Sequence, residues 1–264
     1  MTHLFSAWDS VKARIGGKRL CLFLDCDGTL APIVDTPCGA AIPQKVREAL
    51  IVLLRMPWVK VAVISGRSLR DIKALIGVEG IIYAGNHGLE IEGPGISFKC
   101  ATPPGYAKSL AEIRKRLADE CAAMPGILLE DKGLTLGLHY RMADVSEADL
   151  KSVFHRVTSS YESSGVVKTA YGKKVFEVRP GVDWDKGSAV NWLIGRERSL
   201  AKGEGIAAVY IGDDRTDEDA FRALGKSGIT VRVGQDPSSL AEYYLDDTEQ
   251  VYQVLTMIIG LKKG

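Results

Sequence analysis

The sequence has no long hydrophobic run, no excess of charge of one sign and no signal-like start. No apolar run approaches the roughly 20 residues that cross a bilayer, so we expect no membrane partner. The N-terminus lacks a basic start followed by an apolar stretch and a cleavage site, which argues against a signal peptide. With 34 basic and 33 acidic residues the net charge is +1, so nucleic acid is not an expected partner.

The cysteines and histidines form no motif that would bind zinc or build a disulfide framework. The five cysteines are odd in number and no two are spaced as CxxC, and the four histidines form no HxxxH pair. We therefore expect a reducing, cytoplasmic location. The 264 residues are 46% hydrophobic and 25% charged, which is typical of a globular protein with one large domain or two smaller ones.

Strands and helices alternate in the first and last parts of the chain. Residues 20–24 are apolar at every position, as in a strand buried on both faces of a parallel sheet. Further elements follow the same logic, with strands over 59–64, 81–83, 207–211 and 229–233, and helices over 43–55, from 68, from 186, from 216 and over 249–261. Ser68 with Asp71, and Thr216 with Asp219, look like helix N-caps. The alternation predicts an α/β fold with a mainly parallel sheet.

The middle of the chain has a different pattern. It begins after Pro103-Pro104-Gly105, and helices are predicted over 106–123 and 147–161, with strands over 127–130, 134–140 and 175–178. The strand near 134–139 roughly alternates, as an antiparallel strand with one wet face would. We predict a smaller α+β domain over 104–177, inserted into a core formed by 1–103 and 178–264.

Polar residues follow the predicted strands at the edge where ligands bind in open α/β sheets. Asp25 and Asp27 come directly after the first strand, and their hard oxygen atoms suit Mg²⁺. Asp25 is a candidate nucleophile that would form an aspartyl-phosphate, and Asp27 is a candidate acid and base. Taken alone, the same residues also fit a simple Asp-Gly turn that closes a strand.

Three further candidates complete the predicted site. Ser65 ends the second strand ahead of a helix and is a candidate phosphate ligand, although Ser-Gly is also an ordinary loop dipeptide. Lys186 is a candidate for neutralising the phosphoryl group, although most lysines at helix starts are solvated. Asp213 would complete the metal site, and Asp214 and Asp217 would support it from outside, although acidic residues also favour helix N-termini.

These motifs, in this order, resemble the haloacid-dehalogenase-like phosphatase superfamily. The closer resemblance is to the trehalose-6-phosphate phosphatase family, and it rests on segments 84–90, 130–132, 139–141, 177–180 and 212–218. It implies a Rossmann-like core of the haloacid-dehalogenase type with an inserted cap. It also implies that Asp25, Asp27 and Asp213 hold Mg²⁺, and that Ser65 and Lys186 bind the phosphoryl group.

The resemblance further implies a small sugar phosphate as the substrate. The residues expected to bind it are Lys132, Arg141 and Glu177 of the cap or its hinge, with Arg67, Asn86 and His87 as further candidates. A related phosphatase acting on sucrose phosphate or mannosyl-3-phosphoglycerate stays open. So does a phospho-accepting receiver module, although such a module has no use for an acid two residues past the nucleophile. The sequence does not define an oligomeric state, and a monomer is compatible with it.

Overall fold

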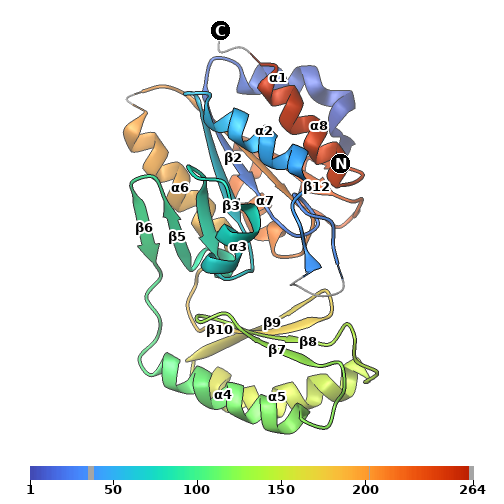
Figure 1. The fold of residues 1–264 in the computed structure, drawn as a ribbon. Coiled ribbons are helices and arrows are strands. Elements are labelled where there is room, and N and C mark those ends of the chain that lie inside the picture. The colour runs from blue at the N-terminus through green and yellow to red at the C-terminus, as the bar shows by residue number, and fades with distance from the viewer. Residues whose placement is uncertain (35–38, 202, 262–264) are drawn as a thin grey trace. The chain divides into compact units, whose positions relative to one another are not determined.

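The computed structural model describes residues 1–34, 39–201 and 203–261, and it divides the chain into two compact units (Figure 1). The first unit combines Met1–Lys99 with Trp184–Gly264, and the second is Cys100–Asp183. The second unit contains the predicted insertion at 104–177 and extends beyond it at both ends. Among the described residues, every helix is too short or too polar to cross a bilayer.

The first unit is built on a nine-stranded sheet with neighbouring strands β1-β13-β12-β11-β2-β3-β4-β5-β6. In this order, every neighbouring pair from β1 as far as β4 is parallel, and the last two pairs, β4 with β5 and β5 with β6, are antiparallel. The strands are β1 (Thr2–His3), β2 (Arg19–Leu24), β3 (Val59–Ile64), β4 (Ile82–Gly85), β5 (Glu90–Gly93), β6 (Ile96–Lys99), β11 (Ile206–Gly212), β12 (Ile229–Val233) and β13 (Tyr243–Leu245).

Helices cover both faces of this sheet (Figure 1). One hydrophobic core joins the sheet to α1 (Trp8–Ile15), α2 (Gln44–Leu54), α3 (Leu69–Ile76) and α8 (Thr248–Ile259), and the other joins it to α6 (Lys186–Leu200) and α7 (Asp217–Leu224). Strand β2 serves both cores, because Leu22 and Leu24 point into the first and Phe23 into the second. This confirms the inference that an all-apolar strand is buried on both faces. Short 3-10 turns add η1 (Leu4–Ala7), η3 (Asn86–Gly88) and η4 (Gly225–Ser227).

The two predicted N-caps had different outcomes. At α3 the Ser68 hydroxyl accepts a hydrogen bond from the backbone N of Asp71 at 3.1 Å, as predicted. The cap by Thr216 at α7 is wrong, because Thr216 has helical dihedral angles and its side chain makes no capping bond. Instead the carboxylate of Asp217 accepts from the backbone N of Asp214 at 2.8 Å, so the side chain of Asp217 orders this turn.

The second unit has an antiparallel sheet of order β7-β8-β10-β9 with two helices packed on it. The elements are α4 (Tyr106–Cys121), β7 (Leu128–Asp131), β8 (Leu136–His139), α5 (Glu147–Ser163), β9 (Val167–Gly172) and β10 (Val175–Pro180). Leu136 and Leu138 enter the core with the helices. Since alternate residues point to opposite faces, Glu130, Gly137 and Glu177, which pair directly across the strands, lie on the face away from these helices.

Candidate active site

Three neighbouring parallel strands deliver polar residues to one edge of the sheet. Asp25 follows β2, Ser65 follows β3 and Asp213 follows β11. Strand β2 lies between the other two, with Leu24 opposite both Val63 and Ile211. The backbone N of Asp25 donates to the carbonyl of Ile211 at 2.9 Å, which fixes the register at this edge. The chain leaves β2 toward β3 on one side and returns in β11 on the other, a switch point of the kind that forms ligand sites.

A buried acidic cluster lies at this edge. Asp25, Asp213 and Asp217 are 4%, 5% and 0% exposed, and each offers a carboxylate oxygen within 4.8 Å of the others. The loop of Gly28 lies against this cluster, because a Cβ on that glycine, whose φ is +81°, would lie 2.3 Å from the Asp213 carboxylate. The structure thus brings together residues from the first and last parts of the chain.

Lys186 enters the cluster from the first turn of α6, which begins at that residue as predicted. Asp185 caps the helix by accepting from the backbone N of Ser188 at 2.7 Å. The Lys186 ammonium is 2% exposed and donates to Oδ1 of Asp25 at 2.7 Å and to Oδ1 of Asp217 at 2.8 Å. The helix cap therefore places the only ammonium among these four groups directly beside the predicted nucleophile.

The charges of the cluster are strongly perturbed. Burial raises the pKa of the Asp25 carboxyl; Lys186 opposes this, while Asp217 and Asp213 raise the pKa further, so it lies well above its usual range. Burial acts to lower the pKa of Lys186, but Asp217 and Asp25 outweigh it and hold that pKa well above its ordinary value. Three carboxylates facing one ammonium leave an excess of negative charge, which a divalent cation would offset.

Both carboxylate oxygens of Asp217 accept hydrogen bonds from within the protein. Oδ1 accepts from Lys186 and from the Tyr210 hydroxyl at 2.7 Å, and Oδ2 accepts from the backbone N of Asp214 at 2.8 Å. These bonds suit a residue that orients Lys186, and they leave Asp25 and Asp213 as the better metal donors of the three. The Asp214 backbone, and not its carboxylate, makes the contact with Asp217.

The predicted acid and base, Asp27, lies in a bidentate ion pair with Arg67. The guanidinium Nε donates to Oδ2 at 2.7 Å and Nη2 donates to Oδ1 at 2.6 Å. The Asp27 side chain is 38% exposed, in contrast to the buried Asp25. We predicted Arg67 as a substrate ligand from the sequence, but its partnership with Asp27 was not foreseen.

The loop after β4 packs onto the loop after β3. The backbone N of His87 donates to the carbonyl of Ser65 at 2.8 Å, and that of Asn86 donates to Arg67 at 2.7 Å. Asn86 and His87 have φ of 50° and 59°, in the left-handed region that non-glycine residues avoid, and the imidazole lies against Gly66. These contacts hold the turn that carries Ser65, whose hydroxyl accepts from the Arg67 backbone N at 3.2 Å.

A second polar cluster lies in the unit formed by residues 100–183. Glu177 is 6% exposed, its Oε1 accepts from Lys132 at 2.9 Å, and its Oε2 accepts from the Arg179 guanidinium. Glu130 joins it from β7, with Oε2 at 2.8 Å from Nε2 of His139 and 3.8 Å from Lys132. The sequence predicted roles for Lys132 and Glu177. It did not predict the strand pairing that brings Glu130 and Arg179 into the same cluster.

Arg141, the third predicted sugar ligand of this unit, lies outside the cluster. It is exposed in the segment after β8, and its guanidinium donates to the carbonyl of Lys173 at 3.3 Å. A role for Arg141 in binding substrate stays a prediction.

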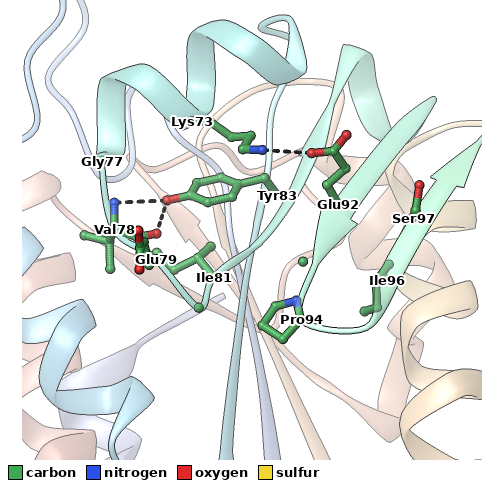
Figure 2. A pocket seen from close by; sticks show the side chains of 12 residues that line it. Lys73, Gly77, Val78, Glu79, Ile81, Tyr83, Glu92, Pro94, Ile96 and Ser97 are labelled. Carbon is green, nitrogen blue, oxygen red and sulfur yellow. Dashed lines mark hydrogen bonds and ion pairs between the residues drawn. The ribbon is translucent and has the colours of Figure 1, made fainter.

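A separate open pocket of about 730 Å³ lies away from these residues (Figure 2). It lies beside the start of β4 and the turn between β5 and β6, whereas Asn86 and His87 follow the other end of β4. Its polar side chains bond nearby, since Lys73 pairs with Glu92 at 2.8 Å and the Tyr83 hydroxyl donates to the carbonyl of Val78 at 2.6 Å. We therefore place the active site at the acidic cluster and not in this pocket.

Solved structures share this architecture. One is the C-terminal domain of Candida albicans trehalose-6-phosphate phosphatase, with a TM-score of 0.77, 25% identity and coverage of 93% of both chains. A Bacteroides thetaiotaomicron phosphatase of the haloalkanoate (HAD) superfamily matches with a TM-score of 0.57 and 15% identity over 92% of this chain and 96% of that one, a likeness of fold alone. These likenesses define the class of the fold as the haloacid-dehalogenase type, with the acidic residues at the strand ends.

Sequence comparison narrows the class to one family. The family model for trehalose-phosphatase matches residues 23–249. The probable trehalose-phosphate phosphatase 4 of Oryza sativa subsp. japonica is 31% identical over 98% of this chain and 71% of that protein, and trehalose-phosphate phosphatase B of Arabidopsis thaliana is 32% identical over 97% and 70%. The chain belongs to the trehalose-phosphatase family. It is therefore a phosphoric monoester hydrolase, as predicted, and not a receiver module.

Proposed function

We propose that the protein hydrolyses trehalose 6-phosphate to trehalose and phosphate with the help of Mg²⁺, through a phosphorylated Asp25. The observation that supports this most directly is the buried contact of Asp25 with Lys186 beside Asp213, in a chain of the trehalose-phosphatase family. The family resemblance supports the choice of sugar, because the residues alone favour phosphate chemistry without naming the alcohol.

The donor set fits magnesium. Asp25 and Asp213 offer buried carboxylate oxygens, and Asp27 is two residues from Asp25 with its own carboxylate held by Arg67, so we propose that Asp27 contributes through its backbone carbonyl. Hard oxygen donors at a site with excess negative charge are what Mg²⁺ prefers. When bound, the ion would neutralise charge on the phosphoryl oxygens.

The proposed reaction has two displacements. In the first, a carboxylate oxygen of Asp25 bonds to phosphorus, the bond from phosphorus to the sugar oxygen breaks, and Asp27 protonates that oxygen. In the second, Asp27 takes a proton from water, whose oxygen bonds to phosphorus and frees Asp25 and inorganic phosphate. Lys186 and Ser65 hold the phosphoryl oxygens in both steps.

The ion pair with Arg67 has a consequence for Asp27. Both carboxylate oxygens of Asp27 accept from the Arg67 guanidinium, whereas an acid catalyst must present one oxygen to the leaving group. We propose that Arg67 releases one oxygen of Asp27 when substrate enters, and that its freed N–H groups bind a phosphoryl oxygen. Asn86 and His87 would hold the Ser65–Arg67 turn in place during this exchange.

We propose that the unit formed by residues 100–183 is a cap that recognises the sugar. Glu177 and Glu130 present carboxylates, and Lys132 an ammonium, on the face of the sheet away from α4 and α5. Alternating acceptors and donors of this kind suit the hydroxyl groups of a disaccharide. A cap would also exclude water during the first displacement.

A phosphate-release assay over a panel of substrates tests the proposed function. The panel consists of trehalose 6-phosphate, sucrose phosphate, mannosyl-3-phosphoglycerate and p-nitrophenyl phosphate. We expect kcat/KM for trehalose 6-phosphate to exceed that of the other sugars by about tenfold or more, because each unmatched buried hydrogen bond costs about 1–3 kcal/mol. A higher value for sucrose phosphate or mannosyl-3-phosphoglycerate would reassign the enzyme to that substrate.

Glu177→Gln is expected to impair the sugar substrate selectively. The amide can no longer accept from both Lys132 and Arg179, so we expect kcat/KM for trehalose 6-phosphate to fall about 10- to 100-fold, while p-nitrophenyl phosphate changes little. Arg141→Ala is expected to act in the same direction. Arg114→Ala is the matched control, because Arg114 pairs with Asp131 at 2.8 Å on the helix side of the same sheet. Equal losses on both substrates would remove Glu177 from sugar recognition.

A further inference from the structure

Tyr210 is a buried phenol in a position where the fold requires only an apolar ring. It lies on β11, is fully buried, and packs edge-on against Phe221 with ring centroids 5.7 Å apart. Both residues belong to the hydrophobic core between the sheet and helices α6 and α7. A phenylalanine would fill the same space, and a buried hydroxyl costs free energy unless it is hydrogen-bonded. The hydroxyl therefore calls for an explanation beyond packing.

The partner of this hydroxyl belongs to the catalytic cluster. It donates to Oδ1 of Asp217 at 2.7 Å, and the Lys186 ammonium donates to the same oxygen at 2.8 Å. Lys186 also donates to Asp25 at 2.7 Å. The phenol and the ammonium thus share one acceptor, and the ammonium in turn is shared between two carboxylates.

We propose that Tyr210 is a positioning residue for phosphoryl transfer, which acts by sharing Oδ1 of Asp217 with Lys186 and so keeps the ammonium at Asp25. An oxygen that accepts a second hydrogen bond attracts each donor less strongly, because its negative charge is already partly compensated. Without the hydroxyl, Oδ1 of Asp217 would keep Lys186 as its donor and would draw the ammonium away from the nucleophile. The inference rests on the proposed role of Asp25 and Lys186, but not on the identity of the sugar.

Tyr210→Phe tests this role, with Tyr83→Phe as its matched control. Tyr83 is also a buried tyrosine of the same sheet, but its hydroxyl bonds to the backbone of Val78 beside the pocket of Figure 2. For Tyr210→Phe we expect kcat to fall about 10- to 100-fold on both trehalose 6-phosphate and p-nitrophenyl phosphate. KM should stay within about twofold of the wild-type value, because the loss concerns the transition state. Tyr83→Phe should keep the wild-type kcat.

Several results would overturn the proposal. These are a Tyr210→Phe enzyme with wild-type kcat, equal losses of kcat in both variants, or a Tyr210→Phe protein that does not fold, since the last two make the hydroxyl structural. Thermal melting and circular dichroism of both variants accompany the kinetics. A wild-type enzyme that hydrolyses p-nitrophenyl phosphate but not trehalose 6-phosphate would reject the proposed substrate, while the comparison of the two tyrosines would stay valid.

Discussion

Asp25→Asn is expected to abolish phosphate release while the protein stays folded. The amide is a poor nucleophile toward phosphorus, and Asp217 cannot replace Asp25, because Asp217 is held by Lys186, Tyr210 and the Asp214 backbone. Loss of a nucleophile costs roughly a thousandfold or more in kcat. The measurement is single-turnover phosphate release, combined with mass spectrometry of acid-quenched enzyme. Wild-type enzyme should carry one added phosphoryl group that the variant lacks.

Asp119→Asn is the control for this experiment, since Asp119 is an exposed residue of α4 and does not belong to the acidic cluster. It should retain the wild-type rate and the phosphorylated species. Phosphate release by Asp25→Asn within about tenfold of wild type would reject the nucleophile assignment.

The raised pKa of Asp25 also predicts how stability depends on pH. Burial first, and then Asp217 and Asp213, favour the protonated acid in the folded state, whereas the unfolded chain ionises near the ordinary pKa of about 4. In metal-free wild-type protein, the contribution of Asp25 to stability should therefore decrease as the pH rises from about 4 toward the raised pKa, because at this group the unfolded state then binds fewer protons than the folded state. Asp25→Asn removes this contribution, so its melting temperature without metal should fall less over the same range.

Local patterns predicted the core well, because each depends on residues near in the chain. β3 (Val59–Ile64) and β12 (Ile229–Val233) have the predicted bounds, and α6 begins at Lys186 as expected. The hairpin of β5 and β6 was not predicted. Its strands are only four residues each and are separated by Pro94 and Gly95, so neither strand is long enough for its alternation of polar and apolar residues to identify it.

The site was predictable as a set of residues but not as a network. Asp25, Lys186 and Asp213 each stand at the edge of an element, and parallel strands bring such edges together. The bond between Asp27 and Arg67 depends instead on side-chain geometry between two loops, which no local pattern specifies. Tyr210 could not be identified from the sequence for another reason. Within an apolar strand, a tyrosine whose hydroxyl bonds to a residue of the site has the same sequence pattern as one that only packs in the core.

Removal of divalent metal is expected to abolish activity, and Mg²⁺ to restore it. Without a cation, Asp213 and Asp217 repel the phosphoryl oxygens, and together with burial they favour the protonated form of Asp25, which is a poor nucleophile. Dialysis against EDTA should lower kcat by about 100-fold or more. Turnover that survives dialysis, with metal content verified by elemental analysis, would contradict the proposed role of the acidic cluster.

Asp213→Asn separates metal binding from catalysis in this prediction. A ligand that binds only the folded state raises the melting temperature with its concentration, so Mg²⁺ should stabilise the wild-type protein. The shift should vanish or need about tenfold more Mg²⁺ in Asp213→Asn, because an amide replaces a buried charged donor. Asp9→Asn, exposed on α1, should keep the full shift. An unchanged shift of the melting temperature by Mg²⁺ in Asp213→Asn would mean that Asp213, at the end of β11, is not a metal ligand. The excess negative charge at the strand ends would then have to be compensated by another group.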